Sequence, residues 1–302
     1  FAVSLRYFSL GEIEIIQDEF SQAFIEKPNE MTMDISYSLR LADKFSMGVA
    51  LRYLRSDLKI GSVDPDAKAA SSFGVDLSAY YQGEEQNFGD IDGRIRAGAI
   101  IQNLGPKIKY DESSVDDSFI PTNLKVGAGF DFLLDQYNTV SVTAEVNKLL
   151  VPTPPILGRE YNFSDINENG VYDDGIDELG ELVSNDPVIY QGQSADVDFM
   201  SGIFQSFSDA PGGFSEELKE FTWALGAEYK YDDSFALRAG YFNESEEKGA
   251  RKFLALGAGF KFSGTKVDLS YLFSASKVPS PLENTLRFSL TFDFGSNEYL
   301  EY

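Results

Sequence analysis

The chain contains no cysteine and no histidine. Without cysteine it has no disulfide, no thiolate nucleophile and no zinc–sulfur site. Without histidine it lacks the usual general base, the usual activating partner of a serine nucleophile and the commonest transition-metal ligand. These absences argue against catalysis, and we expect a protein that is not an enzyme.

Basic side chains are scarce, and long apolar runs are missing. The chain has 25 Lys and Arg against 49 Asp and Glu, a formal net charge of −24. A chain this acidic is not expected to bind nucleic-acid phosphates. No apolar run approaches the roughly 18 residues that a membrane-spanning helix needs. The remaining classes are a soluble β protein and a membrane β-barrel, whose signal is alternation.

Alternation of apolar and polar residues is the dominant pattern. It runs through MTMDISYSLRL (31–41) and FSMGVALRYLRS (45–56), which are separated by Ala-Asp-Lys. A period of two predicts a strand with one apolar face. The short connection predicts an antiparallel hairpin. Each run is about as long as a tilted membrane-spanning strand.

The same pattern predicts twelve strands along the chain. They are 1–10, 31–41, 45–56, 71–82, 94–104, 122–133, 139–150, 220–231, 235–243, 252–262, 265–273 and 284–294. Their connections alternate between short and long, with 83–93 as the one longer turn on the short side. Outer-membrane barrels have short periplasmic turns and long extracellular loops. We therefore expect an all-β fold, a transmembrane antiparallel up-and-down β-barrel in a bacterial outer membrane.

Strand parity extends this prediction to the ends of the chain. If the short turns are periplasmic, an even number of strands must precede Phe1 for both termini to be periplasmic. Two missing N-terminal strands would give a fourteen-stranded barrel. We expect one barrel domain over 1–302, with 151–219 inserted as a long extracellular loop.

The polar faces of the predicted strands carry charges of both signs. Examples are Asp34, Arg52, Asp76, Arg238 and Asp268. A Lys or Arg on the lipid face near the midplane costs about 2–4 kcal/mol, so these faces should line the lumen. Two interpretations remain open, an ion-pair network that fills the lumen and a selective conduction path.

The insertion contains an acidic motif, DINENGVYDDGID (165–177). Its oxygen ligands and its glycine fall at the positions of a calcium loop, but Ile176 stands where a bidentate Glu is expected. The candidate Ca²⁺ ligands are Asp165, Asn167, Asn169, the Val171 carbonyl, Asp173 and Asp177. The alternative is an acidic loop without metal.

Apolar residues outside the strands are candidate partner contacts. They are Phe119, Ile120, Phe199, Ile203, Phe204, Phe207 and Phe214. Exposed aromatics on loops are a liability unless they fold into the barrel mouth as a plug or contact a partner. Ser215 and the residues after it predict a short capped helix.

Five segments resemble a known family. They are IQNLGPKIKY (101–110), IPTNLKVGAGF (120–130), NKLLVPTPP (147–155), GIFQSFSDAPGGFSEELKEF (202–221) and DDSFALRAGYF (232–242). Together they resemble the PorV family, part of the PorV/PorQ group of FadL-like outer-membrane proteins of Bacteroidetes. The Asn-Leu-Gly-Pro and Pro-Thr-Asn-Leu motifs occur more widely in FadL-like barrels. The third and fourth segments are more specific.

The resemblance implies a fourteen-stranded barrel and a role in the type IX secretion system. That role has three implied partners: the large translocon barrel, the C-terminal signal domains of exported cargo, and the cell-surface attachment complex. Outer-membrane lipid is a further expected contact. The alternative is a FadL-like channel for hydrophobic small molecules, which needs a continuous apolar pocket in the lumen. The predicted luminal faces are instead rich in Gly, Ser and charge.

Overall fold

The computed structural model describes residues 1–16, 24–58, 68–89, 91–110, 117–166, 172, 174, 176, 178–184, 186–262, 264–276 and 284–293. It contains two compact units. The first comprises Phe1–Leu149 with Lys219–Tyr302, and the second comprises Leu150–Leu218. We call them the barrel unit and the loop unit. None of the helices in the described residues has the length and apolar character needed to cross a membrane.

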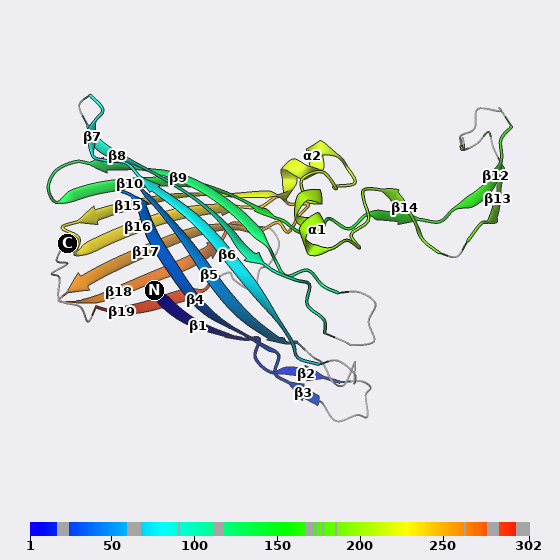
Figure 1. Cartoon of the computed structure of the whole chain (residues 1–302), viewed down its shortest axis with the longest axis horizontal. Helices are drawn as coiled ribbons and strands as arrows, with labels where there is room; N and C mark the ends of the chain where they lie inside the picture. Colours follow the sequence, from blue (N-terminus) through cyan, green and yellow to red (C-terminus); the bar gives the residue numbers. More distant parts are fainter. Residues whose placement is uncertain are drawn as a thin grey trace. The chain divides into compact units, whose positions relative to one another are not determined.

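The barrel unit is an antiparallel meander in which each strand of the main sheet pairs with the next strand of that sheet along the chain (Figure 1). Its strands are β1 (Ala2–Ser9), β4 (Asn29–Ala42), β5 (Phe45–Asp57), β6 (Ala70–Gln82), β8 (Asp92–Leu104), β9 (Asn123–Leu133), β10 (Asn138–Leu149), β15 (Phe221–Tyr231), β16 (Phe235–Asn243), β17 (Lys252–Phe262), β18 (Thr265–Ser274) and β19 (Leu286–Phe292). The short β7 (Gln86–Asn87) adds to β8. The predicted all-β, up-and-down architecture with twelve strands is therefore confirmed.

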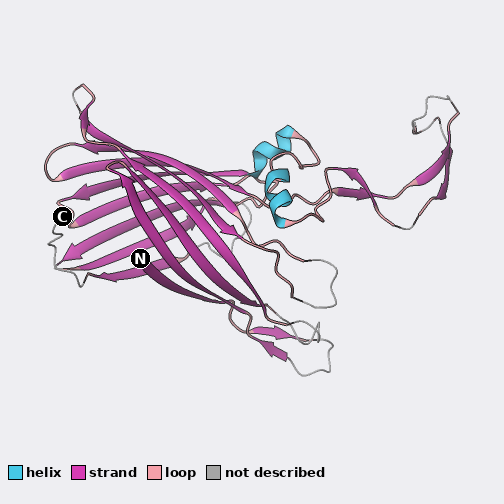
Figure 2. Cartoon of the chain, viewed as in Figure 1, coloured by secondary structure: helices cyan, strands magenta, loops and turns pink. Residues whose placement is uncertain are grey.

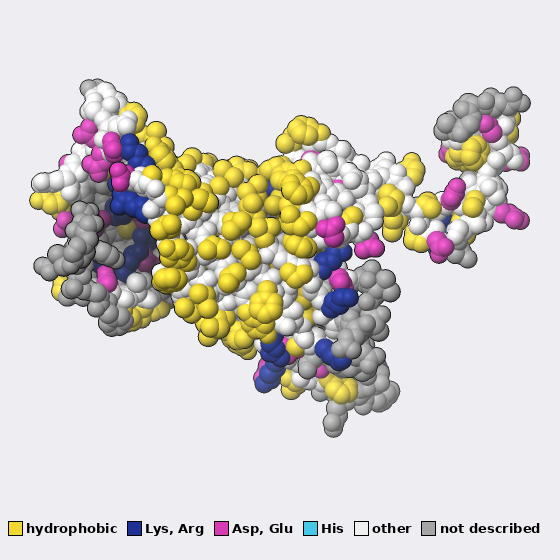
Figure 3. Space-filling view, in the orientation of Figure 1, with side chains coloured by type: hydrophobic (Ala, Val, Ile, Leu, Met, Phe, Trp, Pro, Cys, Tyr) yellow, Lys and Arg dark blue, Asp and Glu magenta, His cyan; other side chains and the backbone are white. Residues whose placement is uncertain are grey.

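The two faces of the sheet differ as the alternation predicts. Along β15, Trp223, Leu225 and Tyr229 are exposed, whereas Ala224 and Glu228 between them are half-buried. On the face drawn in Figure 3, the exposed apolar side chains form a broad band across the barrel unit, and charged side chains gather at the edges of this band. We call this band the apolar belt and the opposite face of the sheet the luminal face. A band of this size on a folded chain is the surface that contacts hydrocarbon.

The loop between β8 and β9 packs against luminal side chains. Ile108 and Ile120 form a small core with Ala70, and Leu54 and Tyr110 pack against it. Backbone hydrogen bonds join Ile108 and Ser118 in both directions. Ile120 is only 3% exposed, so the expectation that it is an exposed loop residue was wrong. Its side chain completes a core, which removes apolar area from water.

The loop unit consists of short elements (Figure 2). Its two ladders pair β11 (Ile156–Gly158) with β14 (Val188–Gln191) and β12 (Tyr161–Ser164) with β13 (Glu178–Leu182). Its helices are α1 (Phe199–Gln205) and α2 (Phe214–Glu217), and η1 (Leu218–Glu220) leads to β15. A third ladder, β2 (Ile13–Ile15) with β3 (Phe24–Glu26), lies in the barrel unit. A helix forms near Ser215 as predicted, but Gly213 occupies its N-cap and makes no side-chain cap bond.

Candidate functional site

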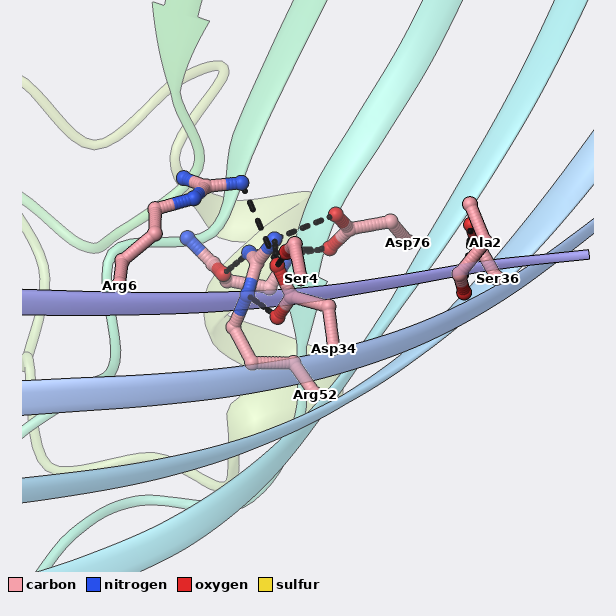
Figure 4. Close-up of polar contacts among 8 residues, drawn as sticks. Ala2, Ser4, Arg6, Asp34, Ser36, Arg52 and Asp76 are labelled. Atoms are coloured by element: carbon pink, nitrogen blue, oxygen red, sulfur yellow. Dashed lines mark hydrogen bonds and ion pairs between the residues drawn. The ribbon is translucent and has the colours of Figure 1, made fainter. Parts of the chain in front are cut away.

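A charge cluster lies on the luminal face of β4, β5 and β6. The guanidinium of Arg52 donates from Nε to Asp34 Oδ1 at 2.6 Å and from Nη2 to Asp76 Oδ2 at 3.0 Å (Figure 4). All three residues are buried. Ser4 Oγ and Arg6 Nη2 on β1 donate to Asp34 Oδ2 at 2.9 and 3.3 Å. Each charge in this cluster is therefore neutralised by neighbouring strands.

Asn103 links the charge cluster to the loop after β8. Its backbone N–H donates to Asp76 Oδ1 at 2.8 Å, and its side-chain carbonyl accepts from Arg52. Its Nδ2 donates to the Pro121 carbonyl at 2.9 Å, and Thr122 Oγ1 donates to the Asn103 carbonyl at 2.8 Å. Asn103 has φ +58°, a left-handed conformation that Asn tolerates better than most residues. The Asn-Leu-Gly-Pro and Pro-Thr-Asn-Leu segments thus contact each other and hold both ends of this loop.

Further ion pairs follow the luminal face toward the short turns. Asp131 pairs with Arg94 at 3.1 Å and with Arg96 at 2.7 Å. Arg238 pairs with Glu228 at 2.5 Å and with Asp268 at 2.6 Å. Of the two interpretations of the luminal charges, these contacts fit the ion-pair network.

The base of the loop unit joins the two most specific motif segments. Asp209 is fully buried, and its Oδ2 accepts the Thr153 backbone N–H at 3.0 Å. Gly192 has φ +89°, and a Cβ there would lie 3.1 Å from Pro211 and 3.3 Å from Pro155. Gln193 Nε2 also donates to the Ser208 carbonyl at 3.0 Å. These contacts fix where the chain enters and leaves the two ladders.

Helix α1 carries exposed apolar side chains, and the side chain of Asp198 caps its N-terminus. Asp198 Oδ1 accepts the backbone N–H groups of Met200 and Ser201, both at 3.1 Å. Its Oδ2 accepts the Ser201 hydroxyl at 2.6 Å. The hydrogen bond from that hydroxyl, followed by those from the backbone, lowers the pKa of Asp198 below its usual range. A charged Asp at the N-cap satisfies helical N–H groups that would otherwise lack partners.

The predicted contact residues of the loop unit differ in exposure. Phe204, Phe207 and Phe214 are 71%, 46% and 77% exposed, and Phe199 is partly exposed. Ile203 is only 8% exposed, so its expected exposure was wrong. The reason is that α1 turns Ile203 inward and Phe204 outward.

The other predicted residues lie apart from this surface. Phe119, in the barrel unit, is half-buried, and the Lys107 ammonium lies 4.5 Å from its ring centroid. Of the candidate calcium ligands, Asp165 belongs to the described chain. Asn167, Asn169, Val171, Asp173 and Asp177 lie outside the described residues. The calcium site stays a prediction.

The structure adds exposed apolar residues to this surface. Met200 and Leu218 in the loop unit are both exposed. Met200 precedes Phe204 by four residues, a spacing that places both on one face of a helix. That spacing was a usable sequence signal, whereas nothing in the sequence marks Leu218 as exposed. We call Met200, Phe204, Phe207, Phe214 and Leu218 the loop-unit apolar surface.

Comparison with known proteins gives a family match. The family model described as "PorV: Type IX secretion system protein PorV" matches residues 1–156, more than half of the chain. Among curated proteins, none matches the chain in sequence.

Solved structures resemble the chain only distantly. The Pseudomonas putida toluene transporter TodX is 11% identical, with a TM-score of 0.41 over 89% of this chain and 72% of TodX. A FadL homologue from Pseudomonas aeruginosa is 11% identical, with a TM-score of 0.35 over 97% of this chain and 75% of that one. A triple mutant of the Rhodopseudomonas blastica porin is 10% identical, with a TM-score of 0.30 over 91% and 85%.

Proposed function

The chain belongs to the PorV family of type IX secretion system proteins, and from this we propose that it is a docking subunit of that system in the bacterial outer membrane. In this proposal it has no enzymatic role. It binds the translocon barrel, accepts the C-terminal signal domain of exported cargo and passes the cargo to the cell-surface attachment complex. The long loops between the barrel strands, including the loop unit, face the cell exterior.

The loop-unit apolar surface is the observation that best supports docking. Phe204 and Phe214 are among the most exposed aromatic residues of the described chain, yet both stand on short helices held by hydrogen bonds. Asp198 caps α1, and Glu216 and Glu217 of α2 accept the backbone N–H groups of Gly212 and Ala210. Rigid aromatic anchors lose little conformational entropy on binding and dominate interface energies. Aromatic side chains this exposed to water favour aggregation. A protein partner that covers them would explain why they stand on the surface.

A pull-down from the native membrane in mild detergent tests this function. We compare wild type with Phe204→Asp/Phe207→Asp, which places charge on the surface. The matched control is Leu134→Asp, an exposed apolar residue in the short turn between β9 and β10. Wild type and control should each retain a very large barrel protein and signal-domain cargo, and the double variant should lose one or both.

Two outcomes would contradict the proposal. Equal recovery of partners by wild type and double variant would exclude the loop-unit apolar surface as the contact. Recovery of bound fatty acid or other hydrophobic small molecules, with no protein partner, would favour a FadL-like channel instead. Heat-modifiable mobility on gels confirms that each variant still folds as a barrel.

A further inference from the structure

The two ladders of the loop unit form an arm that is anchored at its base and exposed along its strands. We use "arm" for β11, β12, β13 and β14. Among the residues that the structure describes, each of these strands pairs with one neighbour only and has one free edge. Every residue of β12 and β14 is exposed, including Tyr190 at 74%. Leu157 and Ile189, which face each other in the β11–β14 register, are also exposed.

Such a ribbon is not expected to be stable without a covering layer. An isolated two-stranded ribbon is at best marginally stable in water. Free strand edges carry unpaired N–H and C=O groups that pair readily with another strand. The arm's base is nevertheless built firmly, because Thr153, Asp209 and Gly192 fix both of its ends. A fixed base and strands with unpaired edges are the features expected of a sheet that gains a further strand from a binding partner.

The negative charge of the arm and its connections indicates what kind of partner can bind there. Residues 156–191 contain nine acidic side chains and one basic side chain, Arg159, a net charge of −8. A second copy of this chain would bring an equally acidic arm, and an anionic lipid surface would likewise be repelled. A basic polypeptide is attracted and gains on-rate from the same field.

We propose that the arm binds an extended, basic polypeptide segment by β-strand addition along the free edge of β14. The partner's backbone supplies the missing hydrogen bonds. Its apolar side chains contact Ile189, on the face that also carries Leu157, and its Lys or Arg side chains pair with acidic residues such as Glu181 and Asp186. This inference extends the proposed docking function to a second surface, and it rests on that function only for the exterior placement of the loop unit.

Peptide binding to the full-length protein in zwitterionic lipid nanodiscs tests the inference. The probe is a fluorescent peptide of about ten residues, one strand in length, that alternates lysine and valine. One control peptide alternates glutamate and valine, and the other alternates lysine and serine. Fluorescence anisotropy gives each affinity, and hydrogen exchange reports which amides become protected.

The lysine–valine peptide should bind, and the amides of 188–191 should gain protection. Ile189→Ser/Tyr190→Ser and Glu181→Lys/Asp186→Lys should each weaken binding by about tenfold. Phe204→Asp/Phe207→Asp, which leaves the arm intact, should bind like wild type. These arm positions are exposed, so the variants should keep the barrel's heat-modifiable mobility.

Three outcomes would overturn the inference. They are tight binding of the glutamate–valine peptide, unchanged affinity in both arm variants, and protection confined to amides outside the arm. Failure of the proposed docking function can be told apart from failure of the arm inference, because the docking function is tested by the pull-down with the Phe204→Asp/Phe207→Asp variant. If the pull-down fails and the peptide still binds at 188–191, the arm inference stands.

Discussion

Arg52 is the residue on which the luminal charge cluster depends. It bridges Asp34 and Asp76, which are each only 6% exposed, and it contacts Asn103 near the end of β8. A buried carboxylate that loses its cation retains the cost of desolvation without the compensating attraction. The cluster therefore couples four strands, β4, β5, β6 and β8, through a single guanidinium.

Arg52→Leu should destabilise the barrel by about 3 kcal/mol, because it leaves two buried carboxylates without their shared cation. Urea unfolding followed by Trp223 fluorescence measures this, since Trp223 is the chain's single tryptophan. Arg55→Leu, on the same strand, is the matched control. Arg55 pairs with Asp57 in a more exposed setting, so its loss should cost less than about 1 kcal/mol. Equal midpoints for the two variants would show that the cluster contributes no stability.

Asp198 gives helix α1 a dependence on pH. Its pKa is lower in the folded chain than in the unfolded chain, so its contribution is fully present above the unfolded value of about 4. It is lost as the pH falls through the lower, folded pKa. Amide protection factors over 199–205 should therefore decline as the pH falls below about 4. In Asp198→Asn, whose amide caps without titrating, this decline should be absent, and its persistence would assign the effect to another group.

At the scale of elements, the twelve strands were predictable because the barrel imposes a strict environment. Hydrocarbon on one side and a polar lumen on the other force a period of two. The predicted and observed strand ends differ by no more than two residues, and β16 and β17 agree at both ends. The arm strands, of three to five residues, are too short for alternation to be recognised.

The candidate site was predictable in part. Aromatic residues in a polar insertion drew attention to Phe204, Phe207 and Phe214, and these are exposed. Alternation carries no information about where a loop folds, so the core position of Ile120 and the inward face of Ile203 could not be foreseen. Buried polar anchors such as Asp209 were missed because Asp in a loop is usually solvated.

Adjacent positions on β15 test which face contacts lipid. Leu225 belongs to the apolar belt, whereas Ala224 lies on the luminal face opposite Glu145 in the β10–β15 register. Leu225→Arg should lower the free energy of unfolding in lipid by about 2–4 kcal/mol. Ala224→Arg should cost less, because its guanidinium faces the lumen near the Glu145 carboxylate. Urea titration in bilayers compares the two, and an equal or larger loss for Ala224→Arg would contradict the assignment of faces.

At the scale of the whole molecule, charge is divided between the strands and the rest of the chain. The twelve barrel strands hold fourteen basic and nine acidic side chains, so the remaining residues hold eleven basic and forty acidic ones. The strands therefore carry net positive charge, and the loops and the loop unit carry the chain's acidity. Partners that approach the long loops meet a strongly negative field, which steers basic surfaces and weakens as salt is added.

The proposed orientation can be measured directly because the chain has no cysteine of its own. Ser208→Cys places a thiol at an exposed position of the loop unit, and Asp43→Cys places one in the short turn between β4 and β5. A membrane-impermeant maleimide added to intact cells should label Ser208→Cys and spare Asp43→Cys. After the outer membrane is permeabilised, both should react. Labelling of Asp43→Cys alone on intact cells would reverse the orientation, and it would place the loop-unit apolar surface and the arm on the periplasmic side, away from surface cargo.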